Sequence, residues 1–243
     1  MGGYLMEGKG LVHERLAAEH QWDDFANRFE TRRRLQIVFE QLLGDHQLIG
    51  RRFLDAGSGG GHFSAAAVQA GAEVWSCDVG ENLLEQVAER CQSHRLVGSV
   101  LDLPFPDEFF DVVLCTEVIE HTPEPLGGLR ELCRVVALNG ALVVTTPCRL
   151  WQPVVRAATF LRLRPYDGYE NFSWPGDHVR TIVRAGLEIE QVKGFNFCPL
   201  FWEPLGPAFR FMDIVVGRIA PWLMVNIAVR ARRPNRSEGI AGS

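Results

Sequence analysis

A glycine-rich segment that follows a short apolar run constrains the fold of this chain most. Residues 53–63 read FLDAGSGGGHF, so the apolar run ends in Asp55 and leads into the alternate glycines Gly57, Gly59 and Gly61. Glycine adopts positive φ without steric strain, so the backbone can turn sharply there and present bare N–H groups. We therefore predict a strand, a loop and a helix, with the loop binding the polar or charged end of a ligand.

Apolar runs and amphipathic stretches alternate along the rest of the chain. Strands are expected at 52–55, 73–78, 95–99, 110–116, 141–146, 187–194 and 224–231, and helices at 30–43, 62–70, 81–91, 126–136, 177–185 and 207–219. The fifth strand is expected to begin after a turn at Asn139 and Gly140. Five strands that alternate with helices predict a parallel, doubly wound α/β sheet, whose ligand lies outside the carboxyl ends of the strands.

Composition narrows the class of protein. A chain of 243 residues with 47% apolar residues suits one large domain, and the formal charge of −5 argues against nucleic acid as a partner. The six cysteines are spread singly, without a C-x-x-C pair, which predicts small buried side chains rather than a zinc site or disulfides. No apolar run is long enough for a membrane span. We expect a cytoplasmic protein that acts on a small molecule; the pattern specifies no oligomeric state.

The spacing of the glycines separates two cofactor classes. A dinucleotide site requires G-x-G-x-x-G, and its third glycine would fall at His62, so an NAD-type oxidoreductase is the weaker alternative. The segment instead reads D-x-G-x-G-x-G from Asp55 to Gly61. A carboxylate in this place would repel a pyrophosphate, whereas it suits a ligand with an ammonium group. S-adenosylmethionine, whose amino acid end carries an ammonium and a carboxylate, fits this requirement.

The next strand ends suggest where the rest of such a cofactor lies. Asp78 ends the second strand, where a carboxylate can accept hydrogen bonds from both ribose hydroxyls. Ser99 and Val100 are placed to line the adenine edge, with Leu83 packing on the ring. Asp102 is a second candidate for the exocyclic amine.

Four segments in this order resemble the class I S-adenosylmethionine-dependent methyltransferases, in particular the bacterial group that includes ubiquinone-biosynthesis and small-molecule enzymes. They read LDAGSGGGHF, VWSCDVGENLL, LDLPFPDEFFDVVLCTEVIEH and LCRVVALNGALVVTTP, and they lie within residues 53–147. The resemblance implies a Rossmann-like doubly wound sheet of seven strands, mostly parallel with one antiparallel strand near the C-terminus. The segment WDDFANRFE resembles the entrance helix of that group, in which an aromatic near Phe29 closes over the cofactor.

The resemblance also implies roles for particular residues. The methionine end would be held by Asp55, Gly57, Ser58, Gly59 and Gly61, the ribose by Asp78 and Val79, and the sulfonium would lie beside Cys115, Thr116 and Glu117. Ser58 stands where the family often has Cys, which is harmless. Ser99 stands where the family usually has an Asp that touches adenine, which weakens that contact.

Methyl transfer mainly requires the acceptor to be positioned in a water-poor site, and a base is needed only for a protonated acceptor. His121, just beyond the fourth strand, is the best-placed base, with a structural or cofactor-proximal role as the alternative. The spacing of Asp102, Glu120 and His121 fits no standard metal site, so we expect no metal.

The acceptor is expected to contact the less regular part of the chain. We interpret residues 148–178 as a substrate-side insertion in a methyltransferase domain at 46–243, preceded by entrance helices at 1–45. Four residues of this part either contact the acceptor or pack as ordinary surface or core side chains: Tyr166, Tyr169, Trp174 and His178. Three interpretations are open for the broad apolar face of 207–219: other parts of the protein cover it, it binds a lipophilic acceptor, or it rests on a membrane surface. A catalytically silent S-adenosylmethionine-binding subunit is a further alternative.

Overall fold

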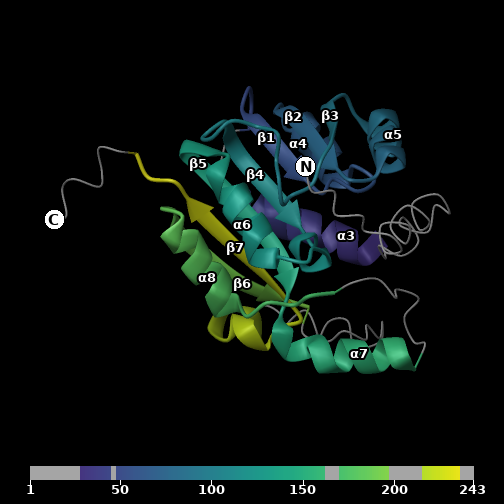
Figure 1. Cartoon of the computed structure of the whole chain (residues 1–243), viewed down its shortest axis with the longest axis vertical. Coiled ribbons are helices and arrows are strands. Elements are labelled where there is room, and N and C mark those ends of the chain that lie inside the picture. The colour runs from purple at the N-terminus through teal and green to yellow at the C-terminus, as the bar shows by residue number, and fades with distance from the viewer. Residues whose placement is uncertain (1–27, 45–47, 162–169, 197–214, 236–243) are drawn as a thin grey trace, which may run out of the picture. The chain divides into compact units, whose positions relative to one another are not determined.

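The strands of the chain form a seven-stranded sheet in the order β3-β2-β1-β4-β5-β7-β6 in the computed structural model (Figure 1). The structure describes residues 28–44, 48–161, 170–196 and 215–235. Internal contacts divide the chain into two compact units, Met1–Ser99 and Val100–Ser243. The domain limits expected from the sequence, 1–45 and 46–243, stay a prediction.

The first unit is a run of parallel strands connected by helices. Its elements are α3 (Arg28–Leu35), η1 (Gln36–Leu43), β1 (Arg52–Ala56), α4 (His62–Gln69), β2 (Glu73–Asp78), α5 (Glu81–Arg90) and β3 (His94–Val97). β2 pairs in parallel with β1 on one side and β3 on the other. Asp55 on β1 is opposite Ser76 on β2, so the ends of both strands, with Asp55 and Asp78, meet at one edge of the sheet.

The helix expected at 30–43 begins at Arg28, and its second half is a π-helix. The buried residues of η1 are Ile37, Val38, Leu42 and Leu43. Ile37 and Leu42, like Val38 and Leu43, are five residues apart, and the wider turn of a π-helix brings such pairs onto one face.

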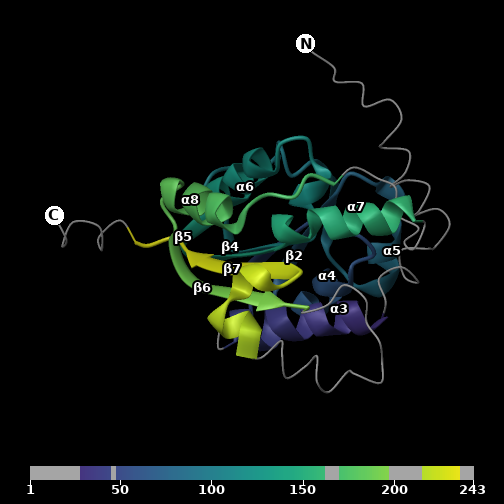
Figure 2. The ribbon, with the colours of Figure 1, turned by 90° about the horizontal axis from the view of Figure 1, so that it is seen from below.

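The second unit contains the parallel pair β4 and β5 and the only antiparallel strand of the described sheet, β7. Its elements are β4 (Phe110–Thr116), η2 (Ile119–His121), α6 (Pro125–Arg134), β5 (Val136–Pro147), η3 (Arg149–Trp151), α7 (Gln152–Phe160), α8 (Pro175–Arg184), β6 (Glu188–Phe195), η5 (Pro221–Leu223) and β7 (Asn226–Arg232). α6 and α8 lie side by side on one face of these strands (Figures 1 and 2). The seven-stranded, mostly parallel fold is confirmed.

β5 is longer than the sequence predicted. The strand begins at Val136, and the register with β4 shifts between Phe110 and Val112. Asn139 adopts a φ of 60° inside the strand. The Asn139–Gly140 pair therefore marks an irregularity within β5, and the expected turn before the strand is wrong.

Other element ends shift by a few residues. β3 ends at Val97, so Ser99 follows the strand, and α8 begins at Pro175, with the proline in its first turn. Of the helix expected at 207–219, residues 207–214 lie outside the described part, and 215–219 are helical.

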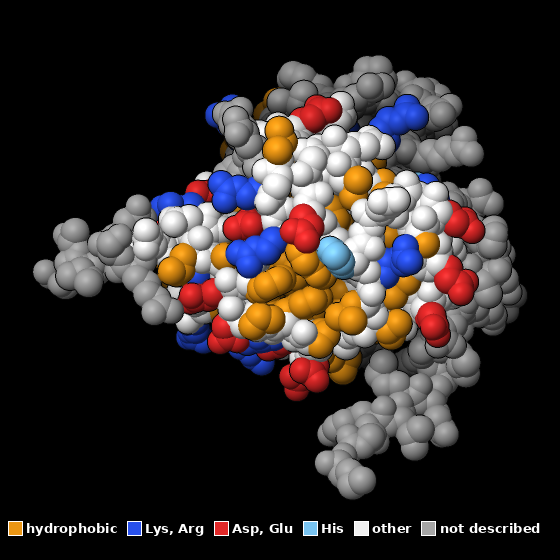
Figure 3. All heavy atoms as spheres, turned by 90° about the horizontal axis from the view of Figure 1, so that it is seen from above, with side chains coloured by type: hydrophobic (Ala, Val, Ile, Leu, Met, Phe, Trp, Pro, Cys, Tyr) orange, Lys and Arg blue, Asp and Glu red, His pale blue; other side chains and the backbone are white. Residues whose placement is uncertain are grey.

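The described helices and one face of the molecule can be compared with what a membrane span and a nucleic-acid site require. No helix in the described ranges is long and apolar enough to cross a bilayer. On the face drawn in Figure 3, basic and acidic side chains alternate around an apolar group. That face therefore presents, among the described residues, no extended basic surface of the kind that binds nucleic acid.

Candidate functional site

The glycine loop links β1 to α4 and has the backbone that the sequence predicts. Gly57, Gly59 and Gly61 all adopt positive φ, at 78°, 50° and 82°. A Cβ on Gly61 would lie 3.0 Å from Cγ2 and 3.1 Å from Cα of Val87 on α5. Both the left-handed conformation and the close approach of α5 therefore require glycine at position 61.

The N–H groups of these glycines are not bare, so that expectation is wrong. The N–H of Gly57 donates to the carbonyl of Cys77 at 2.7 Å, and the N–H of Gly61 donates to the carbonyl of Ser58 at 2.9 Å. The N–H of Gly59 donates to Oδ2 of Asp78 at 2.9 Å. The loop satisfies two of these three donors through β2, because the parallel pairing brings the two strand ends together.

Asp55 and Ser58 carry buried polar atoms at the two ends of the turn that starts the glycine loop. Both side chains are buried, with 1% and 6% of their surface exposed. Oδ2 of Asp55 accepts a hydrogen bond from the Ser64 hydroxyl at 2.6 Å. Oδ1 of Asp55 and Oγ of Ser58 have no hydrogen-bond partner in the described part of the chain. Two such orphaned buried atoms fit a ligand that carries both an ammonium and a carboxylate.

Burial also changes the ionisation of Asp55. Loss of solvation raises the pKa of this carboxyl from 3.8 to about 7, the Ser64 hydrogen bond lowers it, and the charge of Asp78 raises it further. A bound ammonium group would oppose this effect by stabilising the carboxylate.

Asp78 organises the loop around its own carboxylate. Its Oδ2 accepts from Gly59, and its Oδ1 accepts from the N–H of Gly80 at 3.0 Å. Each carboxylate oxygen has a second lone pair, so ribose hydroxyls can still donate to it. Val79 is 59% exposed, whereas Leu83 is buried in the core face of α5.

The residues expected near adenine lie where the first unit ends and the second begins. Ser99 is half-buried, Val100 is buried and Asp102 is exposed. Val100 and Asp102 belong to an irregular segment that continues to Asp107 before β4.

A polar network forms at the carboxyl end of β4. Glu117 adopts a φ of 55°, which is uncommon outside glycine, and its N–H donates to the Thr145 carbonyl at 3.0 Å. Oε1 of Glu117 accepts from the Thr145 hydroxyl at 2.9 Å, and Oε2 accepts from Nδ2 of Asn226 at 2.7 Å. Nδ2 of Asn196 donates to Oδ1 of Asn226 at 3.0 Å. The ends of β4, β5, β6 and β7 thus fix one carboxylate beside the buried Cys115 and Thr116.

Sequence reasoning missed Thr145, Asn196 and Asn226. Each lies at or near a strand end, which was the only available signal. Their meeting depends on β7 lying between β5 and β6.

The segment that begins α8 lies against the turn after β4. His121 ends η2 and is partly exposed, while Glu120 is buried. The backbone N–H of Asn171 donates to the Glu120 carbonyl at 2.7 Å, and its side chain donates to the Pro123 carbonyl at 3.3 Å. The hydroxyl of Thr146 lies 3.5 Å from Oε2 of Glu120.

The predicted acceptor residues have different surroundings. Trp174 is half exposed, and the Arg149 guanidinium lies 5.7 Å from the centre of its ring. His178 is buried, neither ring nitrogen has a partner in the described structure, and burial lowers its pKa to about 4. Tyr166, Tyr169 and the side chain of Phe29 lie outside the described residues.

Thiols and metal ligands add no second centre within the described ranges. Cys77, Cys115, Cys133 and Cys148 are buried free thiols, and burial raises the pKa of Cys77 and Cys133 to about 12. The described residues contain no cluster of three His, Cys, Asp or Glu side chains that could hold a metal.

Strand order and glycine loop together define a Rossmann-like α/β protein, a class whose ligands bind outside the carboxyl ends of the parallel strands. A family model described as "Methyltransferase domain" matches residues 54–144. Ubiquinone biosynthesis O-methyltransferase of Haemophilus ducreyi is 32% identical over 174 residues, which cover 64% of this chain and 74% of the relative. The enzyme of the same name from Xanthomonas euvesicatoria is 32% identical over 178 residues, which cover 68% of this chain and 73% of the relative.

The chain belongs to the class I S-adenosylmethionine-dependent methyltransferases. Magnesium protoporphyrin IX methyltransferase of Synechocystis, solved with bound SAH, has a TM-score of 0.66 at 16% identity and covers 92% of this chain and 99% of its own. This likeness supports the fold. The protein is an enzyme whose cofactor is S-adenosylmethionine, and the NAD-type alternative has no support among these relatives.

Proposed function

We propose that the enzyme methylates an oxygen atom of a small aromatic or lipophilic acceptor. The names of the two relatives at 32% identity, both O-methyltransferases, support the type of acceptor atom. The observation that carries the proposal is the Glu117 carboxylate, fixed from two sides at the end of β4. A carboxylate in this position accepts a hydrogen bond from an acceptor hydroxyl and so orients it.

The two orphaned polar atoms support a position of the cofactor's amino acid end at the glycine loop. S-adenosylmethionine supplies, when bound, a methyl group activated by a sulfonium. Asp55 would pair with its ammonium, Ser58 would donate to its carboxylate, and Asp78 would accept from the ribose. Val100 and Asp102 would line the adenine.

The chain's remaining tasks are to orient the acceptor and remove its proton. Positioning alone supplies roughly 7–11 kcal/mol in favourable cases, and Glu117 and Trp174 are the proposed contacts. A hydroxyl becomes a strong nucleophile only when its proton leaves, and His121 is the proposed base. Its partial exposure supports this role, because the proton can pass on to water. A cytoplasmic location remains a prediction from the sequence.

Transfer of a labelled methyl group to a panel of phenols, amines and carboxylic acids tests the acceptor class. We expect ether products from hydroxyl compounds, identified by mass shift and NMR. Products methylated only at nitrogen would overturn the oxygen assignment. Binding of SAH without turnover of any acceptor would favour the silent-subunit alternative.

His121→Gln tests the base, with His94→Gln on β3 as the matched control because the His94 side chain is 60% exposed. We expect turnover to fall by about 100-fold or more in His121→Gln, with SAH affinity unchanged. The pH–rate profile should also lose its acidic limb. A wild-type profile in this variant would assign His121 a structural role.

A further inference from the structure

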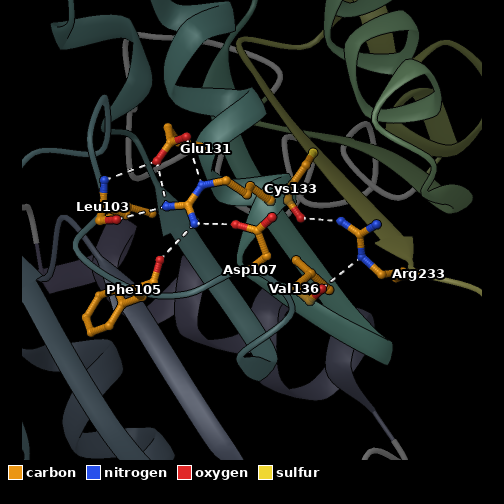
Figure 4. A network of polar contacts seen from close by, with 8 residues as sticks. Leu103, Phe105, Asp107, Glu131, Cys133, Val136 and Arg233 are labelled. Atoms are coloured by element: carbon orange, nitrogen blue, oxygen red, sulfur yellow. Dashed lines mark hydrogen bonds and ion pairs between the residues drawn. The ribbon is translucent and has the colours of Figure 1, made fainter.

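Helix α6 carries an ion pair, Arg134 with Glu131, that is hydrogen-bonded to the irregular segment between Val100 and Asp107 (Figure 4). Arg134, in the last turn of α6, donates from Nη2 to the Leu103 carbonyl at 2.9 Å and from Nη1 to the Phe105 carbonyl at 2.8 Å. Nη1 also donates to Oδ1 of Asp107 at 2.8 Å. One guanidinium therefore binds three successive odd-numbered residues of the segment.

Glu131, one turn earlier on the same helix, binds both Arg134 and the irregular segment. Its Oε1 and Oε2 accept from Nε and Nη2 of Arg134 at 3.0 and 2.9 Å, a two-pronged ion pair. Oε2 also accepts from the N–H of Leu103 at 3.2 Å. The hydrogen bond from Arg134 lowers the pKa of Glu131, so the pair stays charged at neutral pH. Both backbone groups of Leu103 are bound to α6 side chains.

The start of the segment packs on the same helix. A Cβ on Gly128 would lie 3.4 Å from Cγ2 of Val100, and one on Gly127 would lie 3.7 Å from Cδ2 of Leu101. Val100 and Leu103 are 5% and 2% exposed. Small residues at one end of α6 and the ion pair at the other therefore set the position of residues 100–103.

The backbone of this segment forms an isolated bridge at Asp102 and a hydrogen bond from the N–H of Phe105 to the Leu103 carbonyl at 2.8 Å, but no regular ladder. Pro104 and Pro106 lack an N–H group, and no strand or helix covers residues 101–107. The Arg134 guanidinium, with five donors in a rigid fork, satisfies carbonyls that a ladder would otherwise bind. A lysine ammonium has three donors on one nitrogen, so it could not make all five of the hydrogen bonds that Arg134 donates.

We propose that Arg134 is a positioning residue for the adenine end of the cofactor. By binding the carbonyls of Leu103 and Phe105, Arg134 fixes the exposed carboxylate of Asp102. This carboxylate accepts a hydrogen bond from the exocyclic amine of the adenine. The inference rests on the assignment of Val100 and Asp102 to adenine in the proposed function.

SAH and S-inosylhomocysteine form the probe pair, because the second carries a carbonyl in place of the exocyclic amine. Calorimetry should show that the wild-type enzyme prefers SAH by about tenfold, the value of one hydrogen bond to a charged group. We expect Arg134→Gln to lower this preference to less than about threefold by weakening SAH alone. Arg130→Gln, an exposed arginine on the same helix, is the matched control and should keep the wild-type ratio.

Arg134→Lys serves if Arg134→Gln unfolds, since it keeps the charge but not the fork. Asp102→Asn should lose the preference with Arg134 intact. A folded Arg134 variant with the wild-type ratio would overturn the inference, and so would a wild-type enzyme with no preference. A purely structural role would lower the melting temperature and leave the ratio unchanged. Failure of wild type to bind SAH at all would instead overturn the cofactor assignment.

Discussion

Asp55→Asn should remove part of the pH dependence of the free energy of unfolding. The raised pKa of Asp55 means that the folded apoprotein keeps its proton up to about pH 7, whereas the unfolded chain loses it near 3.8. Between these values the folded state binds more protons, so ionisation of Asp55 lowers stability as the pH rises. The shift from 3.8 to about 7 corresponds to about 4 kcal/mol, more than half of it lost between pH 5 and 8.

Urea unfolding of the apoprotein at pH 5 and pH 8 measures this effect. An asparagine side chain has the shape of aspartate and can keep a hydrogen bond with Ser64. We therefore expect Asp55→Asn to be more stable than wild type at pH 8 by up to about 4 kcal/mol, with a smaller difference at pH 5. Glu85→Gln, at an exposed position of α5, changes the charge equally and should leave the wild-type slope intact. Parallel curves for wild type and Asp55→Asn would refute the buried-carboxyl reasoning.

The same carboxyl couples cofactor binding to protons. If the ammonium of SAH pairs with ionised Asp55, binding below pH 7 must release a proton. Affinity should then rise by about tenfold between pH 6 and pH 8. Calorimetry in buffers of different ionisation enthalpy detects the released proton, and Asp55→Asn should bind weakly without it. Wild-type affinity that does not change with pH would remove Asp55 from the ammonium site.

Substitutions at three further positions test other parts of the structure. Asp78→Ala removes the hydrogen-bond acceptor of the Gly59 N–H, so we expect the free energy of unfolding to fall by about 1–3 kcal/mol. SAH should bind at least about tenfold more weakly in calorimetry, and unchanged affinity would contradict this. Asn226→Asp sets a second carboxylate beside Glu117, so turnover should fall at pH 8 and recover at lower pH, whereas Asn226→Ala should show no recovery. Wild type should lose about 3 kcal/mol of unfolding free energy as the pH falls from 6.5 to 4, because the unfolded chain protonates His178 and the folded protein does not. His178→Leu should not show this loss in urea unfolding at the two pH values.

Much of the fold follows from local pattern. β2 and β4 have the expected bounds, because their apolar runs lie in the parallel sheet and end in polar residues. The predicted start of β5 was wrong, because Asn139 adopts a left-handed conformation inside the strand, whereas the sequence suggested a turn before it. The doubly wound class predicted from the alternation of strands and helices is confirmed, and so is the seven-stranded sheet that the family resemblance implied.

The candidate site could be predicted only in part. Asp55 and the glycines are contiguous, so their spacing alone identified the loop. The sequence suggested that the N–H groups of Gly57 and Gly59 would be bare. In the structure both donate hydrogen bonds to residues of β2, a pairing that the loop's own sequence does not indicate. Glu117 and Asn226 are 109 positions apart, and only the strand order brings them together.

The place of β7 has a consequence for how the chain is made. β7 is the last of the described strands along the sequence, yet it lies between β5 and β6, and β6 is paired only with β7 in the described sheet. During synthesis β6 therefore has no neighbour to join until residues 226–232 leave the ribosome, and until then β5 offers an open edge. The Glu117 carboxylate also lacks its Asn226 partner in that interval. A growing chain can build the glycine loop early, while the groups proposed to meet the acceptor come together only when the final strand inserts.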